Sequence, residues 1–199
     1  MPDIPESWIR YIFQERRAIL ERMSKGEVAR CEIYLSFTRA MPAIVTYGPA
    51  GINASIKMIG ILPRKDMIEE VYMEVLEFMQ GKHDMGSIVS FLLDRVYIED
   101  RLDFTKLFTL DLARRNTWRN LRANDEAILL FFTPPSRSFM VKARTTIHED
   151  DIISRFANAM HDMFHFREIE RVPRAPAYVF HITEIWDKSA DKFGVRIYP

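Results

Sequence analysis

The chain has 199 residues, of which 48% are hydrophobic and 28% charged, an ordinary balance for a globular protein. Its 28 basic and 28 acidic side chains cancel, which argues against a bulk electrostatic binder of nucleic acid and against a polybasic membrane-surface protein. Glycine is scarce, and no Gly-rich phosphate-binding loop is present. Because Cys31 is the single cysteine, no intrachain disulfide can form.

The amino terminus lacks the basic and apolar regions of a signal peptide, and no apolar run is long enough to span a membrane. We therefore expect a cytoplasmic protein. The length predicts one domain over residues 1–199 that buries a core without a metal or disulfide.

In the first half of the chain, hydrophobic spacing and turn residues predict an N-terminal helix followed by strands and a helical pair. The expected elements are a helix at 5–24, strands at 28–36, 41–47 and 52–62 with a turn at 48–51, and helices at 67–80 and 84–97. The strands around the Gly/Pro turn are expected to form a hairpin.

In the second half, strands dominate. The expected elements are a strand at 105–110, a basic helix at 112–123, strands at 126–133 and 137–147 around a turn at 134–136, a helix at 149–165, and strands at 176–186 and 193–198. Strands joined by short turns and interrupted by a few helices predict an α+β fold, an antiparallel barrel-type domain, because a doubly wound sheet needs regular alternation.

The basic segment is the first candidate site. Arg114, Arg115 and Thr117 are expected at the beginning of the helix, where free backbone N–H groups suit an anion. Arginine adds paired donors that match phosphate oxygens, and the threonine hydroxyl adds one more. From charge alone, a solvated basic face without a ligand is the stronger alternative.

The order of the elements favours a bound phosphate over a solvated basic face. "RRNTWRNLRAN" followed by the apolar strand "EAILLFF" resembles the flavin-binding split-barrel family, which includes the pyridoxamine 5'-phosphate oxidases and related deazaflavin-binding reductases. The hairpin "IVTYGPAGINASIKMIG", the strand "RSFMVKARTTIHEDD" and the late strand "APAYVFHITEIWDKS" are similar to the family's other strands. The resemblance covers roughly residues 41–62 and 105–197, and it implies an antiparallel split β-barrel with flanking helices.

The resemblance also implies a cofactor and its ligands. Arg114, Arg115 and Thr117 would bind the phosphate of FMN, a deazaflavin being the alternative cofactor. The side chains that would approach the ring or the ribityl chain are Asn53, Ser55 and Lys57, while Asn120 would fix the helix and its loop. No catalytic residue is assigned.

A homodimer with flavin at its interface is implied as well. The implied activity is that of a flavin-dependent oxidoreductase acting on an unidentified small molecule. A non-catalytic flavin or deazaflavin sensor or carrier is the alternative.

Two features depart from the family. Residues 63–104 form a helical insertion between barrel strands, and the Arg-Leu-His segment that vitamin B6 oxidases use for their substrate phosphate is not recognisable. Cofactor binding is therefore expected, and the vitamin B6 substrate is not.

Other candidate residues favour structural roles. His161 and His165 share a helix face and could chelate zinc, but two exposed histidines without an obvious third ligand are the stronger interpretation, and we expect no metal. His181, in the middle of a strand, and Cys31 are expected to pack in the core or at an interface.

The zero net charge conceals two local excesses. Residues 101–122 carry six bases and two acids, whereas residues 65–100 carry nine acids and three bases. The positive segment is small enough for one phosphate group.

Overall fold

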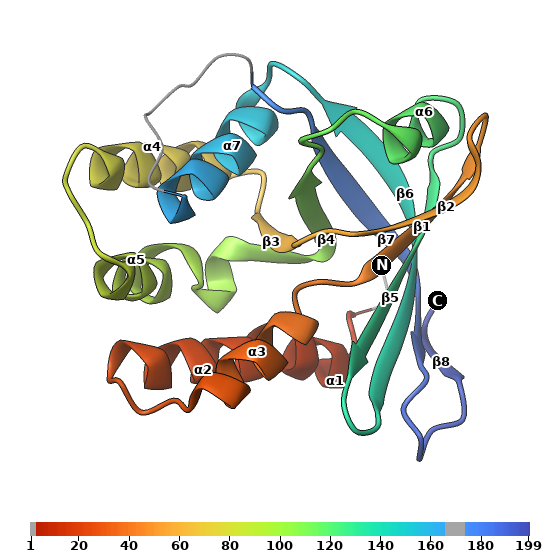
Figure 1. Ribbon diagram of the computed structural model, residues 1–199, viewed down its shortest axis with the longest axis horizontal. Helices are drawn as coiled ribbons and strands as arrows, with labels where there is room; N and C mark the ends of the chain where they lie inside the picture. The colour runs from red at the N-terminus through yellow and green to blue at the C-terminus, as the bar shows by residue number, and fades with distance from the viewer. Residues whose placement is uncertain (1–2, 166–173) are drawn as a thin grey trace.

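A computed structural model describes residues 3–165 and 174–199 (Figure 1). Residues 166–173, within the stretch 105–197 that carries the family resemblance, lie outside the described residues. The described strands form one antiparallel sheet in the order β2-β1-β5-β6-β7-β4-β3, with β8 also paired to β7. They are β1 (Ala43–Gly48), β2 (Gly51–Ile56), β3 (Gly60–Pro63), β4 (Leu102–Leu110), β5 (Glu126–Thr133), β6 (Arg137–His148), β7 (Ala177–Asp187) and β8 (Val195–Tyr198).

The sheet curls into an open barrel. β2 and β3 lie at opposite ends of the strand order, yet only residues 57–59 separate them in the chain. Four Cα–Cα steps span at most about 14 Å, so the two ends of the sheet must come close to each other. They are not hydrogen-bonded, which leaves the barrel split. The predicted α+β class, an antiparallel split β-barrel with flanking helices, is confirmed.

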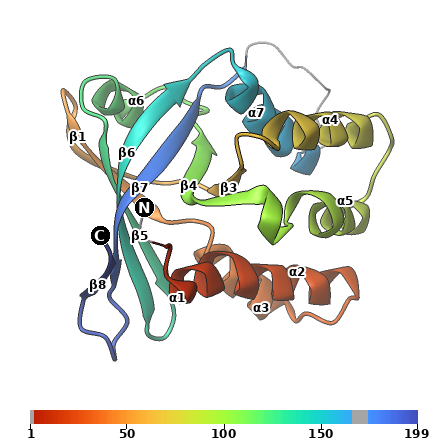
Figure 2. The ribbon, with the colours of Figure 1, turned by 180° about the vertical axis from the view of Figure 1, so that it is seen from behind.

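The helices pack beside the sheet, with α5 lying between α2 and α4 in both views (Figures 1 and 2). The N-terminal helix is continuous through α1 (Glu6–Ile9), η1 (Arg10–Gln14) and α2 (Glu15–Ser24), as predicted. The other helices are α3 (Arg30–Thr38), α4 (Ile68–Met79), α5 (Met85–Phe91), η2 (Leu92–Val96), η3 (Glu99–Arg101), α6 (Asn116–Leu121) and α7 (Ile152–Phe164). No helix within the described ranges is long and apolar enough to cross a membrane.

Two apolar clusters hold these layers together. Inside the barrel, Trp8 of the N-terminal helix packs edge-on against Phe131 of β5, with ring centroids 5.3 Å apart. On the other face of the sheet, α4 and α7 bury side chains such as Val75 and Phe156 against β4 and β7. Because α4 and α5 bury one apolar stripe each, the segment predicted as an insertion at 63–104 packs onto the barrel.

The segment at 28–36 is a helix, so the strand predicted there is wrong. Both edges of β1, the next strand along the chain, are already paired, with β2 and β5. Glu32 stabilises the start of α3 by accepting a hydrogen bond from the Ala29 N–H at 3.1 Å, and it pairs with Arg22 of α2 at 2.7 Å. β-branched and aromatic residues favour strands only where a pleated neighbour exists. Cys31, expected to be packed, is exposed on this helix.

The single strand predicted at 52–62 is divided. β2 pairs with β1, whereas β3 pairs with β4 at the far end of the strand order. The chain turns at residues 57–59, where the Ile59 N–H donates to the Ala40 carbonyl at 2.7 Å. The change of partner, rather than any break in the apolar pattern, ends the first strand.

The predicted basic helix at 112–123 is too long, since α6 covers only Asn116–Leu121. Arg115 is the N-cap of α6, and Arg114 lies in the preceding loop with a φ of 46°. A non-glycine residue in this left-handed region carries a backbone cost of about 1–2 kcal/mol.

Candidate functional site

A polar cluster forms where β2 faces α6, beside the β1–β2 hairpin (Figure 1). Exposure alternates along β2, so Asn53 and Ser55 lie on its half-buried side. The Asn53 amide donates to the Thr117 hydroxyl at 3.0 Å, and the Ser55 hydroxyl lies 3.2 Å from the same oxygen. The fold therefore brings Thr117 into contact with two other predicted cofactor ligands, although it lies 64 positions after Asn53 and 62 after Ser55 in the chain.

Asn120 fixes α6 to the hairpin. Its fully buried side chain accepts from the Ala50 N–H at 2.8 Å, and it donates to the Gly51 carbonyl at 2.8 Å and to the Thr46 hydroxyl at 3.3 Å. A Cβ on Gly48 would lie 2.9 Å from the Asn120 Cα, so only glycine permits this close approach. This agrees with the expectation that Asn120 fixes the helix and its loop.

The loop before α6 presents two arginines. The Arg114 side chain is half-exposed, 3.7 Å from Glu149, and its guanidinium carbon lies 5.3 Å from the centre of the Trp118 ring. Arg115 is exposed, and within residues 3–165 and 174–199 no ion pair joins it to an acid. Two cationic side chains thus precede Thr117 by three and two positions in the chain, and neither is strongly neutralised.

Lys57 follows β2 and does not contact Thr117. Its ammonium group lies 3.2 Å from a carboxylate oxygen of Asp111, whose side chain is only 3% exposed. The Tyr178 hydroxyl donates a short hydrogen bond to the other oxygen of the same carboxylate. Burial, followed by the hydrogen bond to Asp111 and the charge of that carboxylate, raises the pKa of Tyr178 far above its ordinary range, so this phenol is a neutral donor.

Sequence reasoning missed Asp111 and Tyr178. Asp111 directly precedes the basic segment, and that position is the only signal the sequence carries. Nothing in the sequence links it to Tyr178, 67 residues away on β7. The antiparallel pairing of β4 with β7 brings them together, with Leu110 opposite Ala177.

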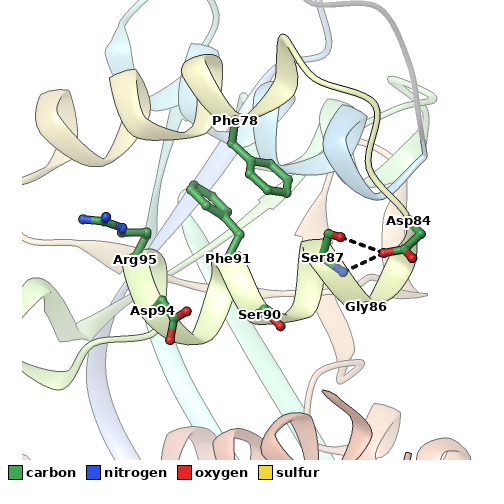
Figure 3. A pocket seen from close by; sticks show the side chains of 8 residues that line it. All are labelled: Phe78, Asp84, Gly86, Ser87, Ser90, Phe91, Asp94 and Arg95. Carbon is green, nitrogen blue, oxygen red and sulfur yellow. Dashed lines mark hydrogen bonds between the residues drawn. The ribbon is translucent and has the colours of Figure 1, made fainter. Parts of the chain in front are cut away.

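A separate hollow of about 570 Å³ lies between α4 and α5 (Figure 3). The rings of Phe78 and Phe91 stack within it, with centroids 4.2 Å apart, and Asp84 caps α5 through Ser87 at 2.8 Å. None of the predicted site residues lines this hollow.

His161 and His165 lie side by side on α7, with ring centroids 4.3 Å apart. Within the described part of the chain, no group of three or more His, Cys, Asp or Glu side chains could hold a metal ion. His165 is exposed as expected, whereas His161 is only partly exposed.

No family model and no curated protein matches the chain. Solved structures are similar at low identity. The Group A Streptococcus protein HupZ has a TM-score of 0.48 and 9% identity over 85% of this chain and 98% of its own. A Clostridium acetobutylicum protein of the pyridoxinephosphate oxidase family, related to general stress protein 26, has a TM-score of 0.46 and 14% identity over 84% and 91%.

An FMN-binding, pyridoxamine 5'-phosphate oxidase-related protein from Nostoc punctiforme has a TM-score of 0.43 and 10% identity over 86% of this chain and 98% of its own.

Proposed function

We propose that this protein binds FMN, with the phosphate held by Arg114, Arg115 and Thr117. The observation that carries the proposal is the contact of Thr117 with Asn53 and Ser55 directly beside the two arginines. Guanidinium groups donate paired hydrogen bonds that match phosphate oxygens, and the Thr117 hydroxyl can turn its proton toward an anion. The left-handed backbone at Arg114 supports the proposal, since strained residues cluster at ligand sites.

The charges of the site fit a single phosphate. Arg115 has no acidic partner within the described ranges, and Arg114 faces Glu149 only at 3.7 Å across a half-exposed surface. An exposed pair of this length contributes at most about 1 kcal/mol, so a phosphate can displace it.

Asn53 and Ser55 lie on the half-buried side of β2, Lys57 follows the strand and is half-buried as well, and the three side chains would lie against the ribityl chain or the ring. Bound FMN would supply hydride or electron transfer, while the protein binds it, orients it and excludes water. The proposed activity is that of a flavin-dependent oxidoreductase of the pyridoxamine 5'-phosphate oxidase-like type acting on an unidentified small molecule. A deazaflavin would place its phosphate at the same arginines.

A homodimer is part of the proposal. One row of side chains on the outer face of the barrel is apolar across five strands, through the pairs Ile56–Ala43, Ala43–Leu130, Leu130–Met140 and Met140–Trp186. Ile56 is 61% and Leu130 42% exposed. A continuous apolar band of this kind favours burial against a second copy.

The absorption spectrum of the purified protein with added FMN tests cofactor binding. We expect a bound flavin spectrum in the unaltered protein and at least tenfold weaker binding in Arg115→Gln, because a charged hydrogen bond to phosphate is lost. Arg10→Gln, which breaks an exposed pair with Glu6, is the matched control and should bind normally.

An unaltered protein that leaves FMN free at about 100 μM would contradict the proposal, because a site of this charge should hold FMN more tightly. Oxidation of a reduced nicotinamide by the FMN-loaded protein in the presence of an acceptor would separate an enzyme from a non-catalytic sensor or carrier.

A further inference from the structure

We propose that Lys57 donates to the ring portion of bound flavin, and that Asp111 and Tyr178 are positioning residues that hold its ammonium group there. This inference rests on the proposed FMN site, because it assigns one residue of that site to one part of the cofactor.

The polar row along β2 has two ends. Residues 53, 55 and 57 are half-buried and residues 54, 56 and 58 are exposed, so the alternation continues past the last strand residue. Asn53 and Ser55 contact Thr117, whereas Lys57 contacts Asp111. Arg115 is the N-cap of the helix that carries Thr117, whereas the Lys57 end contacts the carboxylate of Asp111, which also accepts from the Ala113 N–H at 3.4 Å.

The buried carboxylate decides which end can hold the phosphate. An ionised side chain that is 3% exposed persists only when it is paired and hydrogen-bonded, and Lys57 and Tyr178 provide both interactions to Asp111. A phosphate placed against Asp111 would be repelled by it. The phosphate therefore belongs at Arg115 and Thr117, and the uncharged ring belongs at the Lys57 end.

The ammonium group retains donors for that ring. Lys57 has three N–H donors, of which one points to Asp111, and its side chain is 16% exposed. Carbonyl oxygens on the ring edge are suitable acceptors for the other two. The Tyr178 ring stacks against Trp118, with centroids 6.5 Å apart, and its hydroxyl keeps the Asp111 carboxylate in place.

The Lys57–Asp111 pair has no net charge, which gives the inference an electrostatic signature. Asp111→Asn leaves one positive charge beside the ring, and Lys57→Met leaves one negative charge. Because reduction adds electrons to the flavin, a positive charge favours the reduced form and a negative charge disfavours it. The midpoint potential of bound FMN should therefore rise in Asp111→Asn and fall in Lys57→Met.

The test measures this potential at one pH, together with the ratio of the dissociation constants of riboflavin and FMN. We expect the relative affinity for reduced and oxidised FMN to change tenfold or more in each single variant, which is about 30 mV for a two-electron couple. The Lys57→Met/Asp111→Asn double variant should return close to the unaltered value. Tyr178→Phe removes one donor from the carboxylate, so it should lower the potential less than Lys57→Met does.

The ratio of the dissociation constants of riboflavin and FMN separates ring contacts from phosphate contacts. Lys57→Met should weaken riboflavin and FMN equally and leave the ratio within about twofold, whereas Arg115→Gln should weaken FMN alone. Lys82→Met, at an exposed position between α4 and α5, is the matched control and should change neither quantity.

If the midpoint potential of bound FMN shifts in the same direction in both single variants, or does not shift, the inference is overturned. The proposal that the protein binds FMN would still stand. Selective loss of FMN over riboflavin in Lys57→Met would also overturn it, since Lys57 would then be a phosphate ligand. If Asp111→Asn does not fold, the double variant must show a higher potential than Lys57→Met, and equality would count against the inference. An unaltered protein that binds no FMN would instead overturn the proposed function, and the inference with it.

Discussion

At the scale of the residue, Asn120 fixes the geometry of the candidate site. Its buried amide joins three points of the β1–β2 hairpin, so the position of Thr117 three residues earlier depends on it. Asn120→Ala leaves the Ala50 N–H and the Gly51 carbonyl without their side-chain partner. We expect the free energy of unfolding to fall by about 2–4 kcal/mol in urea titration.

Asn124→Ala is the matched control for this loss. Asn124 donates to the Tyr47 carbonyl at 3.2 Å and accepts from the Glu126 N–H at 3.2 Å, but both contacts lie at the surface. Water can replace them, so the expected loss is below about 1 kcal/mol. Equal losses in the two variants would contradict the role given to Asn120.

His181 makes stability depend on pH. Burial, and then the charges of Lys106 and His148, lowers its pKa below the ordinary 6.5. Below about pH 6.5 the unfolded chain takes up a proton that the folded chain does not, so the free energy of unfolding falls as the pH drops. His181→Gln should reduce the difference in stability between about pH 7.5 and 5.5, as measured by urea titration at each pH. If His181→Gln shows the same difference in stability between the two pH values as the unaltered protein, His181 is not the source of the pH dependence.

At the scale of the element, the close approach of the hairpin to α6 is the feature most sensitive to substitution. A Cβ at Gly48 meets the backbone of Asn120, which cannot move without shifting α6. Gly48→Ala should therefore lower the free energy of unfolding by about 1–3 kcal/mol and weaken FMN binding. In Gly86→Ala, the control, the added carbon meets only Asp84 at 3.6 Å, and alanine favours α5. If Gly48→Ala is as stable as Gly86→Ala, the hairpin does not approach the Asn120 backbone as closely as described.

Elements marked by an apolar run and a following turn could be predicted from the sequence. β5 is an example, since its apolar run ends at the turn of Pro134 and Pro135, which predicts the bounds 126–133 that the structure has. The helix at 30–38 and the break after Ile56 could not be predicted, because each depends on which strands pair with one another. The same limit applies to the site. Thr117 and Ser55 carry a local signal, but the Asp111–Tyr178 contact depends on the pairing of β4 with β7.

At the scale of the whole molecule, the outer apolar face predicts self-association. Leu130→Glu places a charge at the centre of this face, at a position 42% exposed, so the fold should survive while the dimer dissociates. Sedimentation velocity should show a dimer for the unaltered protein and a monomer for the variant. Met73→Glu, 62% exposed on α4, is the control and should stay dimeric. A monomeric unaltered protein, or a dimeric Leu130→Glu variant, would contradict the proposed interface.

The arginine loop and the polar row along β2 are proposed to hold a mononucleotide flavin together. Titration of the unaltered protein with FMN and with riboflavin, followed by flavin fluorescence, tests this proposal. We expect an FMN dissociation constant of about 1 μM or lower and binding of riboflavin at least tenfold weaker, because riboflavin lacks the phosphate. Equal affinities for the two flavins, or no binding of either, would contradict it.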